Sequence, residues 1–347
     1  MTTSDAARKS PAPHSADRPA ATGAMAAIVQ DVYGGSDVLR HEQVARPSVA
    51  PGEVLVRVVA AGLDRGTWHL MTGKPYLMRI AGLGLRRPKE RIIGRDMAGI
   101  VAAVGAGVTR FAVGEEVFGV GRGTFAEYAV ASEGKVARKP ANLSFEQAAV
   151  VPISAATALQ ALTDAGRIES GQRVLVIGAS GGVGSYAVQL AKALGAEVTG
   201  VASTTKLDHV RALGADHAID YTRDDYADGS HTYHLILDIA GNPTLRRLRR
   251  SLTPRGTAVL VGGENGGNLT GGMNRTLRAL ALSPFVGQRF ATFINKEQSS
   301  HLELLTELIE SGRVTPSVDR TYPLDRAPEA MRHLEAGQAR GKVAISL

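Results

Sequence analysis

The chain contains no cysteine among its 347 residues. Disulfide bonds, thiol chemistry and metal sites built on thiolates are therefore excluded. A sequence without cysteine is also compatible with a reducing compartment, and we expect the protein to be cytoplasmic.

Long apolar runs are missing as well, because no stretch approaches the roughly 18 apolar residues that a transmembrane helix needs. Residues 1–24 hold Ala, Pro, Ser and charged residues without an apolar core, so they predict a disordered tail rather than a secretory signal. The length and a hydrophobic content of 44% then predict a soluble enzyme with two domains.

Aromatic residues make up only 5% of the chain, although its net charge is +7. The densest basic cluster has four arginines between positions 246 and 250, and no aromatic side chain stands among them to stack on bases. Leucines recur between these arginines, which predicts the solvated face of a helix. We therefore expect no nucleic-acid partner, and the surplus charge helps to attract an anionic cofactor.

The most informative segment is 173–203, which has the pattern of strand, glycine turn, amphipathic helix and second strand. Glycines at such a turn let backbone N–H groups approach a phosphate, and the helix N-terminus favours the anion. A dinucleotide on Gly181, Gly182 and Val183 is the expected ligand. One alternative is that the glycine-rich turn only shortens the connection between strand and helix and binds no ligand. An ATP-type loop is disfavoured because no lysine follows the last glycine directly.

The end of the second strand carries no acid, whereas NAD binders place a carboxylate there for the ribose 2′-hydroxyl. Ser203, Thr204 and Lys206 stand there instead and offer hydroxyl donors and a cation to a 2′-phosphate. NADPH is therefore the expected cofactor. The alternative is that Lys206 is a solvated surface lysine and that both cofactors are accepted.

Strand candidates lie on both sides of this unit. Those downstream alternate with helical patterns and predict a doubly wound parallel sheet; they are 217–221, 235–241 and 257–263. Those upstream are short and separated by glycine-rich turns, as in a small β-barrel; they are 53–63, 98–108, 115–120 and 125–132. A closing strand is expected at 342–347.

Five motifs, in this order, resemble the medium-chain dehydrogenase/reductase superfamily, and more narrowly its zinc-independent quinone oxidoreductase branch. They are GRDMAGIVAAVGAGVTRFAVGEEVFG (94–119), ANLSFEQAAVVPISAATALQAL (141–162), GASGGVG (178–184), ALGADHAIDY (212–221) and ARGKVAISL (339–347). The resemblance implies an α/β fold with a GroES-like β-barrel-type catalytic domain and a Rossmann doubly wound parallel sheet. The implied boundaries are 25–154 for the catalytic domain, 155–295 for the Rossmann domain and 296–347 for a return to the catalytic domain.

The resemblance also bears on the metal. Zinc-dependent relatives carry Gly-His-Glu where this chain has Gly94, Arg95 and Asp96, and the remaining histidines show no three-ligand spacing. We therefore expect no zinc. Without a Lewis acid to stabilise an alkoxide, the implied reaction is hydride transfer from NADPH to a small hydrophobic quinone or α,β-unsaturated carbonyl. Two alternatives stay open: an NAD(P)-dependent alcohol or carbonyl dehydrogenase, and a nucleotide-binding interaction protein with little or no turnover.

Further site residues follow from the same resemblance. Thr157 is expected near the nicotinamide, and further cofactor contacts are expected from Tyr221, Gly262 and Lys342. Residues 60–76 are expected to line the substrate cleft.

Candidate catalytic residues in that segment are Asp64, Trp68, His69 and Tyr76. Relatives often have Asn-Pro where this chain has Asp64 and Arg65, so the proton donor stays open between His69, Tyr76 and water. Core packing is an equal alternative for Trp68 and His69, and a turn or helix cap is one for Asp64.

Two segments are apolar with interspersed basic residues, namely 74–91 and 273–290. They are expected to form either a lid over a hydrophobic substrate or a surface patch for a membrane or a partner. The strand candidate 291–295 is expected at the edge of the nucleotide-binding sheet. Exposed edges invite pairing, so we expect a homodimer through residues 285–295.

Overall fold

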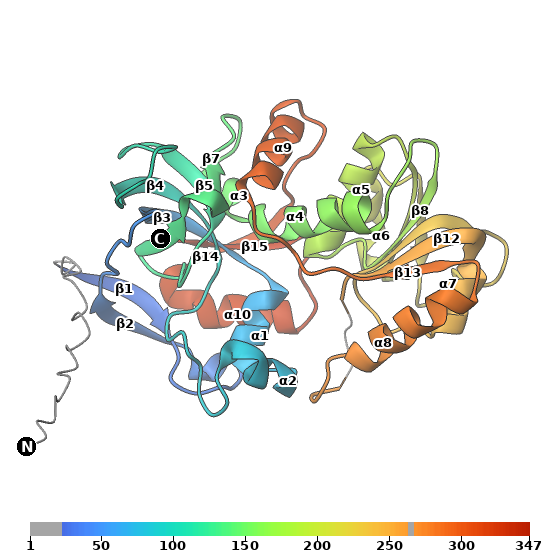
Figure 1. Ribbon diagram of the computed structural model, residues 1–347, viewed down its shortest axis with the longest axis horizontal. Helices are drawn as coiled ribbons and strands as arrows, with labels where there is room; N and C mark the ends of the chain where they lie inside the picture. Colours follow the sequence, from blue (N-terminus) through green and yellow to red (C-terminus); the bar gives the residue numbers. More distant parts are fainter. Residues whose placement is uncertain (1–22, 263–266) are drawn as a thin grey trace, which may run out of the picture.

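The computed structural model describes residues 23–262 and 267–347, and two large sheets organise them (Figure 1). One sheet has six strands and lies toward the right of Figure 1; the other has seven and lies toward the left. The predicted tail lies outside the described residues up to position 22, and the first strand already begins at Ala24. None of the helices in the described ranges is long and apolar enough to cross a bilayer.

The six-stranded sheet is parallel throughout, with the order β10-β9-β8-β11-β12-β13. Its strands are β8 (Arg173–Ile177), β9 (Glu197–Ala202), β10 (His217–Asp220), β11 (Tyr233–Asp238), β12 (Leu252–Leu260) and β13 (Arg289–Ala291). The strand order reverses between β8 and β11, and ligands of open α/β sheets bind at the carboxyl edge beside such a reversal. The predicted doubly wound parallel sheet is therefore confirmed.

Helices cover both faces of this sheet because their apolar stripes are buried against it. In α5, for example, Tyr186, Ala187, Leu190 and Ala191 are buried on one face. The helices of this half are α4 (Pro152–Gln160), η4 (Ala161–Ala165), α5 (Gly182–Ala193), η5 (Thr204–Lys206), α6 (Leu207–Ala212), α7 (Leu245–Ser251), α8 (Met273–Leu282) and η6 (Ser283–Phe285). Helix α9 (Ser299–Glu310) lies at the junction, between α4 and β7 (Val136–Arg138) of the other sheet. Helix α7 buries Leu248 and exposes most of its arginines, as the leucine spacing predicts.

The seven-stranded sheet is antiparallel except for the pair β14–β15. Its order is β14-β15-β3-β4-β5-β7, with β6 on β3. The strands are β3 (Glu53–Leu63), β4 (Asp96–Val104), β5 (Glu116–Val120), β6 (Tyr128–Ser132), β7 (Val136–Arg138), β14 (Val318–Pro323) and β15 (Lys342–Ser346). Because β14 and β15 come from the end of the chain, the C-terminus returns to this sheet.

Smaller elements surround this second sheet. Strands β1 (Ala24–Val29) and β2 (Arg40–Ala45) form a hairpin-like pair. The helices are η1 (Ser36–Val38), α1 (Arg65–Thr72), α2 (Tyr76–Met78), η2 (Arg79–Leu83), η3 (Glu133–Lys135), α3 (Phe145–Ala149), η7 (Leu324–Arg326) and α10 (Ala327–Glu335). The predicted combination of a GroES-like antiparallel half and a Rossmann-type half is the fold observed.

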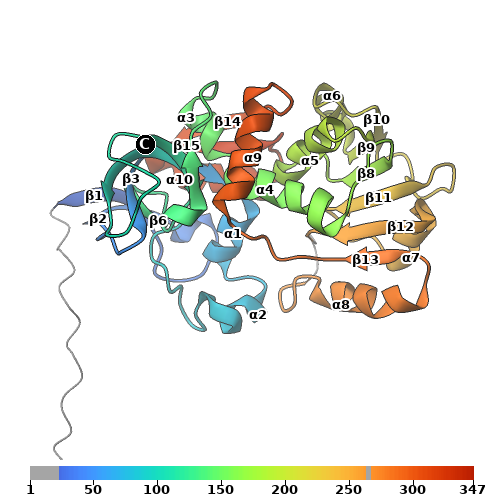
Figure 2. The same ribbon diagram turned by 45° about the horizontal axis from the view of Figure 1, so that its top comes forward.

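One apolar cluster joins the two halves. It includes Ala60 and Phe118 from the antiparallel sheet, Leu235 from the parallel sheet, and buried residues of α3 and α4 between them. Figures 1 and 2 both place α4 at the junction of the two sheets. The polar groups at this junction are therefore held in fixed positions by surrounding core packing.

The edge strand differs from its prediction. We expected a strand at 291–295, but pairing covers only β13 at 289–291. The side chain of Gln160 accepts a hydrogen bond from the backbone N–H of Lys296, so the chain after β13 is bonded to α4 instead of extending the sheet. The edge position is as expected, while the homodimer and the domain boundaries stay predictions.

Candidate active site

The turn after β8 requires glycine at two positions. Gly178 has a φ of +88°, and a Cβ there would lie 2.6 Å from the Cβ of Ala240. A Cβ on Gly184 would lie 2.0 Å from the carbonyl oxygen of Gly178. Glycine therefore allows both the turn and the close packing of α5 on β8.

Gly181 and Gly182 have a different role, because they leave the start of α5 open. Gly181 is the N-cap with extended backbone, and no side chain caps the helix. The first N–H groups of an α-helix have no acceptor within it, so those of Gly182 and Val183 are available to an anion. A Cβ on Gly181 would meet no atom closer than 3.5 Å, so there is space for an anion beside these N–H groups. These donors fit the pyrophosphate of a dinucleotide.

The segment 337–342 links this turn to β15 of the seven-stranded sheet. The N–H of Gly341 donates to the carbonyl of Ser180 over 2.8 Å. The ammonium of Lys206 donates to the carbonyls of Gly337 and Ala339 over 2.7 and 2.8 Å. Lys206 therefore holds this segment beside the end of β9, a contact that sequence reasoning missed.

The predicted 2′-phosphate residues gather at the end of β9, but an acid reaches them from the neighbouring strand. Thr204 donates its hydroxyl to Asp220, the last residue of β10, and the N–H and hydroxyl of Thr222 bind the other carboxylate oxygen. These hydrogen bonds, that of Thr204 above all, lower the pKa of Asp220. The expectation that no acid lies here is wrong, because it considered only β9 itself. Tyr221 follows Asp220 directly and is largely exposed.

The carboxyl edge of β11 carries a buried ion pair. Asp238 ends β11, and Arg275 of α8 donates to its carboxylate and also to the carbonyls of Pro243 and Gly262. Burial raises the pKa of Asp238 to about 6, although Arg275 works in the opposite direction. The pair fixes the start of α8 and the predicted cofactor residue Gly262 against the sheet.

Lys342 lies behind the glycine turn rather than in solvent. The residue is 2% exposed, and its ammonium donates to the hydroxyl of Ser154 over 2.9 Å. The carboxylate of Asp96 lies 3.7 Å from the same ammonium. Burial raises the pKa of Asp96 well above its ordinary value, while the charge of Lys342 lowers it. The pair joins β4 and β15 of one half to α4 of the other.

Asp64 lies in the same region, as the cap of α1. One carboxylate oxygen accepts the N–H and hydroxyl of Thr67 over 2.7 and 3.1 Å. The other oxygen is buried and has no hydrogen-bond partner among the described residues. The negative charge of Asp64 contributes to the raised pKa of Asp96. Both the cap role and a role in the site are therefore compatible with this geometry.

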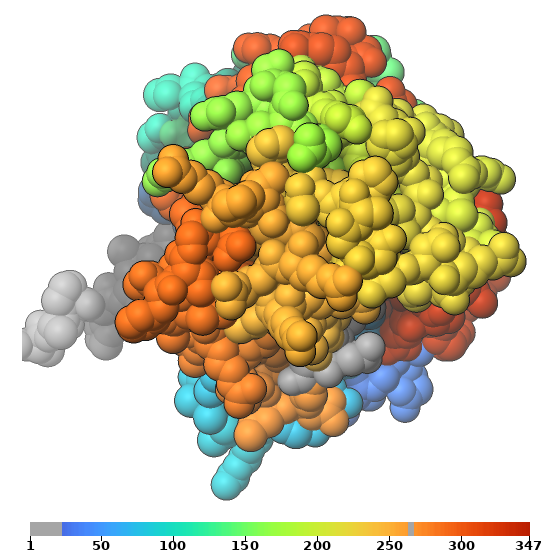
Figure 3. Space-filling model, turned by 90° about the vertical axis from the view of Figure 1, so that its right-hand side faces the viewer, coloured from blue at the N-terminus to red at the C-terminus, as the bar shows by residue number. Residues whose placement is uncertain are grey.

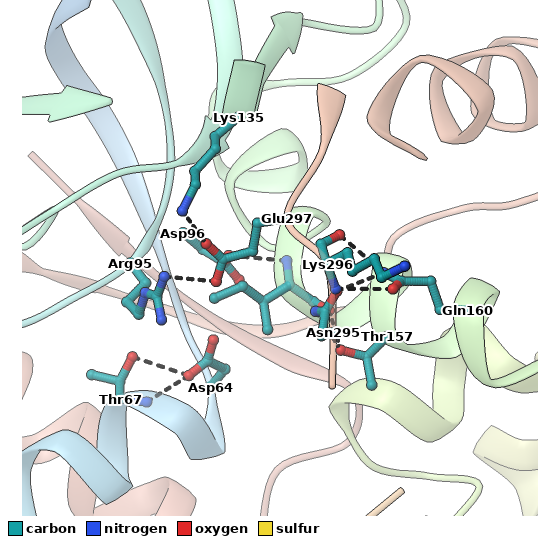
Figure 4. A network of polar contacts seen from close by, with 11 residues as sticks. Asp64, Thr67, Arg95, Asp96, Lys135, Thr157, Gln160, Asn295, Lys296 and Glu297 are labelled. Carbon is teal, nitrogen blue, oxygen red and sulfur yellow. Dashed lines mark hydrogen bonds and ion pairs between the residues drawn. The ribbon is translucent and has the colours of Figure 1, made fainter. Parts of the chain in front are cut away.

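Figure 4 shows Asp64 and Asp96 on one side of the junction and the α4 residues Thr157 and Gln160 on the other. On α4, Thr157 donates to the carbonyl of Ile153 over 2.7 Å and accepts from the side chain of Asn295 over 2.8 Å. Gln160 donates to the other end of the same Asn295 amide over 2.6 Å. The hydroxyl of Thr157, expected near the nicotinamide, is thus held in one orientation.

A second ion-pair set crosses the junction. Glu297 accepts from Arg95 over 2.6 Å and from Lys135 over 2.9 Å. Arg95 stands where zinc-dependent relatives carry a histidine ligand, and a guanidinium has no lone pair to offer a metal. No group of three or more His, Asp or Glu side chains within 23–262 and 267–347 is arranged to hold a metal ion. The absence of zinc stays a prediction.

The remaining catalytic candidates have structural partners. The indole N–H of Trp68 donates to Glu335 on α10 over 2.8 Å, and the ring packs against the core of the antiparallel half. Nδ1 of His69 lies 2.6 Å from the carbonyl of Lys74, and since a carbonyl only accepts, Nδ1 carries the proton. Tyr76 is the first residue of α2; its backbone N–H donates to the carbonyl of Asn268 in the other half, and its side chain is exposed.

Comparisons with known proteins agree with this architecture. A family model for the alcohol dehydrogenase GroES-like domain matches residues 50–141, and one for zinc-binding dehydrogenase matches residues 213–345. The NAD(P)H oxidoreductase RTN4IP1, mitochondrial, of Mus musculus is 33% identical over 93% of this chain and 89% of its own. The chain belongs to the medium-chain dehydrogenase/reductase superfamily.

Two further relatives extend the comparison. The 2-methylene-furan-3-one reductase of Solanum lycopersicum is 35% identical over 90% of this chain and 76% of its own. The structure of the quinone oxidoreductase from Coxiella burnetii superposes with a TM-score of 0.82 at 26% identity, covering 94% of this chain and all of that one. The resemblance to the quinone oxidoreductase branch is therefore shared by sequence and by fold.

Proposed function

We propose that the protein is an NADPH-dependent reductase of quinones or α,β-unsaturated carbonyls. The observation that carries the proposal is the open start of α5 at the junction of the two sheets. A Cβ on Gly182 would lie 3.5 Å from the hydroxyl of Ser154 on α4, the helix that also carries Thr157. Relatives named NAD(P)H oxidoreductase, 2-methylene-furan-3-one reductase and quinone oxidoreductase support a nicotinamide cofactor and this class of acceptor, and one named NADPH-dependent alkenal/one oxidoreductase supports NADPH.

Different residues of the chain would bind different parts of the cofactor. The N–H groups of the first turn of α5 would hold the pyrophosphate, and Thr157, oriented by Asn295, would contact the nicotinamide. When bound, NADPH supplies a hydride for the acceptor. Ser203 and Lys206 would bind the 2′-phosphate, whereas the hydroxyl of Thr204 already donates to Asp220.

The acceptor side needs a proton to complete the reduction. Trp68 and His69 are bonded to Glu335 and Lys74, so we assign them to positioning α1 rather than to proton transfer. The proton then comes from Tyr76, whose side chain is partly exposed, or from water. No zinc is needed in this proposal, and dialysis against a strong chelator should leave the rate unchanged.

A panel of acceptors tests the proposal. NADPH absorbance should fall when quinones or enones are added to the purified protein, and it should fall more slowly with NADH. Oxidation of simple alcohols with NADP⁺, without enone reduction, would favour the alcohol dehydrogenase alternative. Tight NADPH binding with no turnover on any acceptor would favour an interaction protein.

A further inference from the structure

We propose that one face of the molecule, formed by α2, η2 and α8, docks on an anionic lipid bilayer. We call this face the apolar-basic face and define it by residues 74–89 and 267–285. The inference goes beyond the proposed reaction and does not depend on it.

The first observation is unpartnered apolar surface. Helix α8 presents Met273, Leu277 and Leu280 to solvent, at the i, i+4 and i+7 spacing of a single helical stripe. The most exposed apolar residues of the face are Ile80 at 74%, Leu269 at 68%, Leu85 at 66% and Leu277 at 59%, with Phe285 at 85% beyond the end of α8. Grouped exposure of this kind marks an interaction surface rather than ordinary surface leucines.

The two parts of the face are held together. The N–H groups of Tyr76 and Leu77 donate to the carbonyls of Asn268 and Leu269 over 2.8 and 3.2 Å. Figures 1 and 2 both place α2 and α8 on the lower side of the molecule, and in Figure 3 the orange atoms around α8 meet the cyan atoms around α2 at the lower edge. The face is therefore one surface, although its parts lie almost 200 residues apart.

The second observation is charge. The chain holds 33 acidic residues, yet none lies within 74–89 or 267–285. These segments carry seven lysines and arginines, five in the first and two in the second, and of these Arg275 is largely buried in its ion pair with Asp238. Arg86, Arg87, Lys89 and Arg278 are exposed within or beside the apolar residues.

Exposed apolar residues together with exposed basic residues favour a lipid surface as the partner. Apolar side chains with surrounding cations and no acids match a membrane surface, where the chains enter the headgroup region and the cations meet anionic lipid. A second copy of the chain fits poorly, because a two-fold contact through this face would place cations against cations. A nucleic acid would leave the leucine stripe uncovered.

Vesicle co-sedimentation of the full chain tests the proposal. We expect the protein to bind vesicles of phosphatidylcholine with phosphatidylglycerol, to bind pure phosphatidylcholine weakly, and to be released by high salt. Arg278→Glu and Ile80→Ser should each lower the vesicle partition coefficient, the charge reversal by about tenfold. Circular dichroism of each variant, unchanged from the parent, shows that it is folded.

Matched controls use α9, which lies on the upper side in Figures 1 and 2. Arg313→Glu, just beyond α9, makes the same change in net charge, and Leu304→Ser removes an exposed leucine of α9. Both should bind vesicles like the parent. The proposal is overturned if the parent ignores anionic vesicles, if the control variants lose as much binding as the face variants, or if the face variants instead convert a dimer to monomer in light scattering.

Discussion

The two halves of the active site are built in different ways. On the nucleotide side, local backbone forms the site: a turn of seven residues, 178–184, supplies the glycines and the helix N-terminus together. On the opposite side, side chains far apart in sequence form it, as when Asp96 on β4 and Ser154 on α4 approach Lys342 on β15. The first kind of site is predictable from a motif, whereas the second exists only once the chain has folded.

The largest expected effect comes from breaking the long-range pair. Lys342→Met leaves Asp96 buried without its cation, so the free energy of unfolding at neutral pH should fall by about 3 to 5 kcal/mol. The loss should shrink in acid, because Asp96, whose pKa burial raises, then takes up a proton. Denaturant unfolding of Lys342→Met and of Lys342→Met with Asp96→Asn checks this; equal losses in both would contradict the coupling.

In the glycine turn, stability should depend on side-chain volume rather than on charge. Gly184→Ala places a methyl group against the carbonyl of Gly178, so the free energy of unfolding should fall by about 1 to 3 kcal/mol. Gly181→Val is the matched control: its backbone is extended, so the fold should tolerate it while binding of NADPH and NADH both weaken. Unfolding curves and cofactor titrations separate the two effects, and a Gly181→Val protein that binds both cofactors normally would remove the turn from the binding site.

Lys206 follows β9 and bonds to residues 337 and 339 near the end of the chain, so its substitution tests both kinds of contact at once. Lys206→Ala should raise the Kd for NADPH about 10- to 100-fold, which corresponds to roughly 1.5 to 3 kcal/mol, and affect NADH much less. Fluorescence titration with each cofactor measures the ratio. Equal weakening of both would show that Lys206 acts only by holding residues 337–339.

The most gradual effect concerns Asp238 at the carboxyl end of β11, because it develops over about two pH units. The folded pKa of Asp238, about 6, lies above the ordinary 3.8, so the folded state keeps a proton that the unfolded state releases. The free energy of unfolding should therefore fall as pH rises from about 4 to 6, by at most about 1.4 kcal/mol per unit, and this contribution levels off above. Asp238→Asn should lack that slope, and parallel pH profiles of the two proteins would refute the shift.

Features that depend on local sequence patterns could be predicted from the sequence. The glycine turn, the strand β3 at 53–63 and the alternation of parallel strands with helices follow from periodicity and turn residues. The contacts of Thr157 with Asn295, and of Thr204 with Asp220, do not, since each depends on how separate elements pack. The strand expected at 291–295 shows the same limit: its apolar pattern is suitable, but Gln160 of α4 bonds the backbone at Lys296.

The most direct test of the central claim follows the hydride itself. Chelator-treated protein is incubated with NADPH deuterated at the transferring position of the nicotinamide and with an α,β-unsaturated carbonyl, and the product is analysed by mass spectrometry. We predict that one deuterium per molecule appears on carbon in the reduced product, because hydride passes directly between cofactor and acceptor without a metal. A reduced product without deuterium, or no reduction until zinc is restored, would contradict the account.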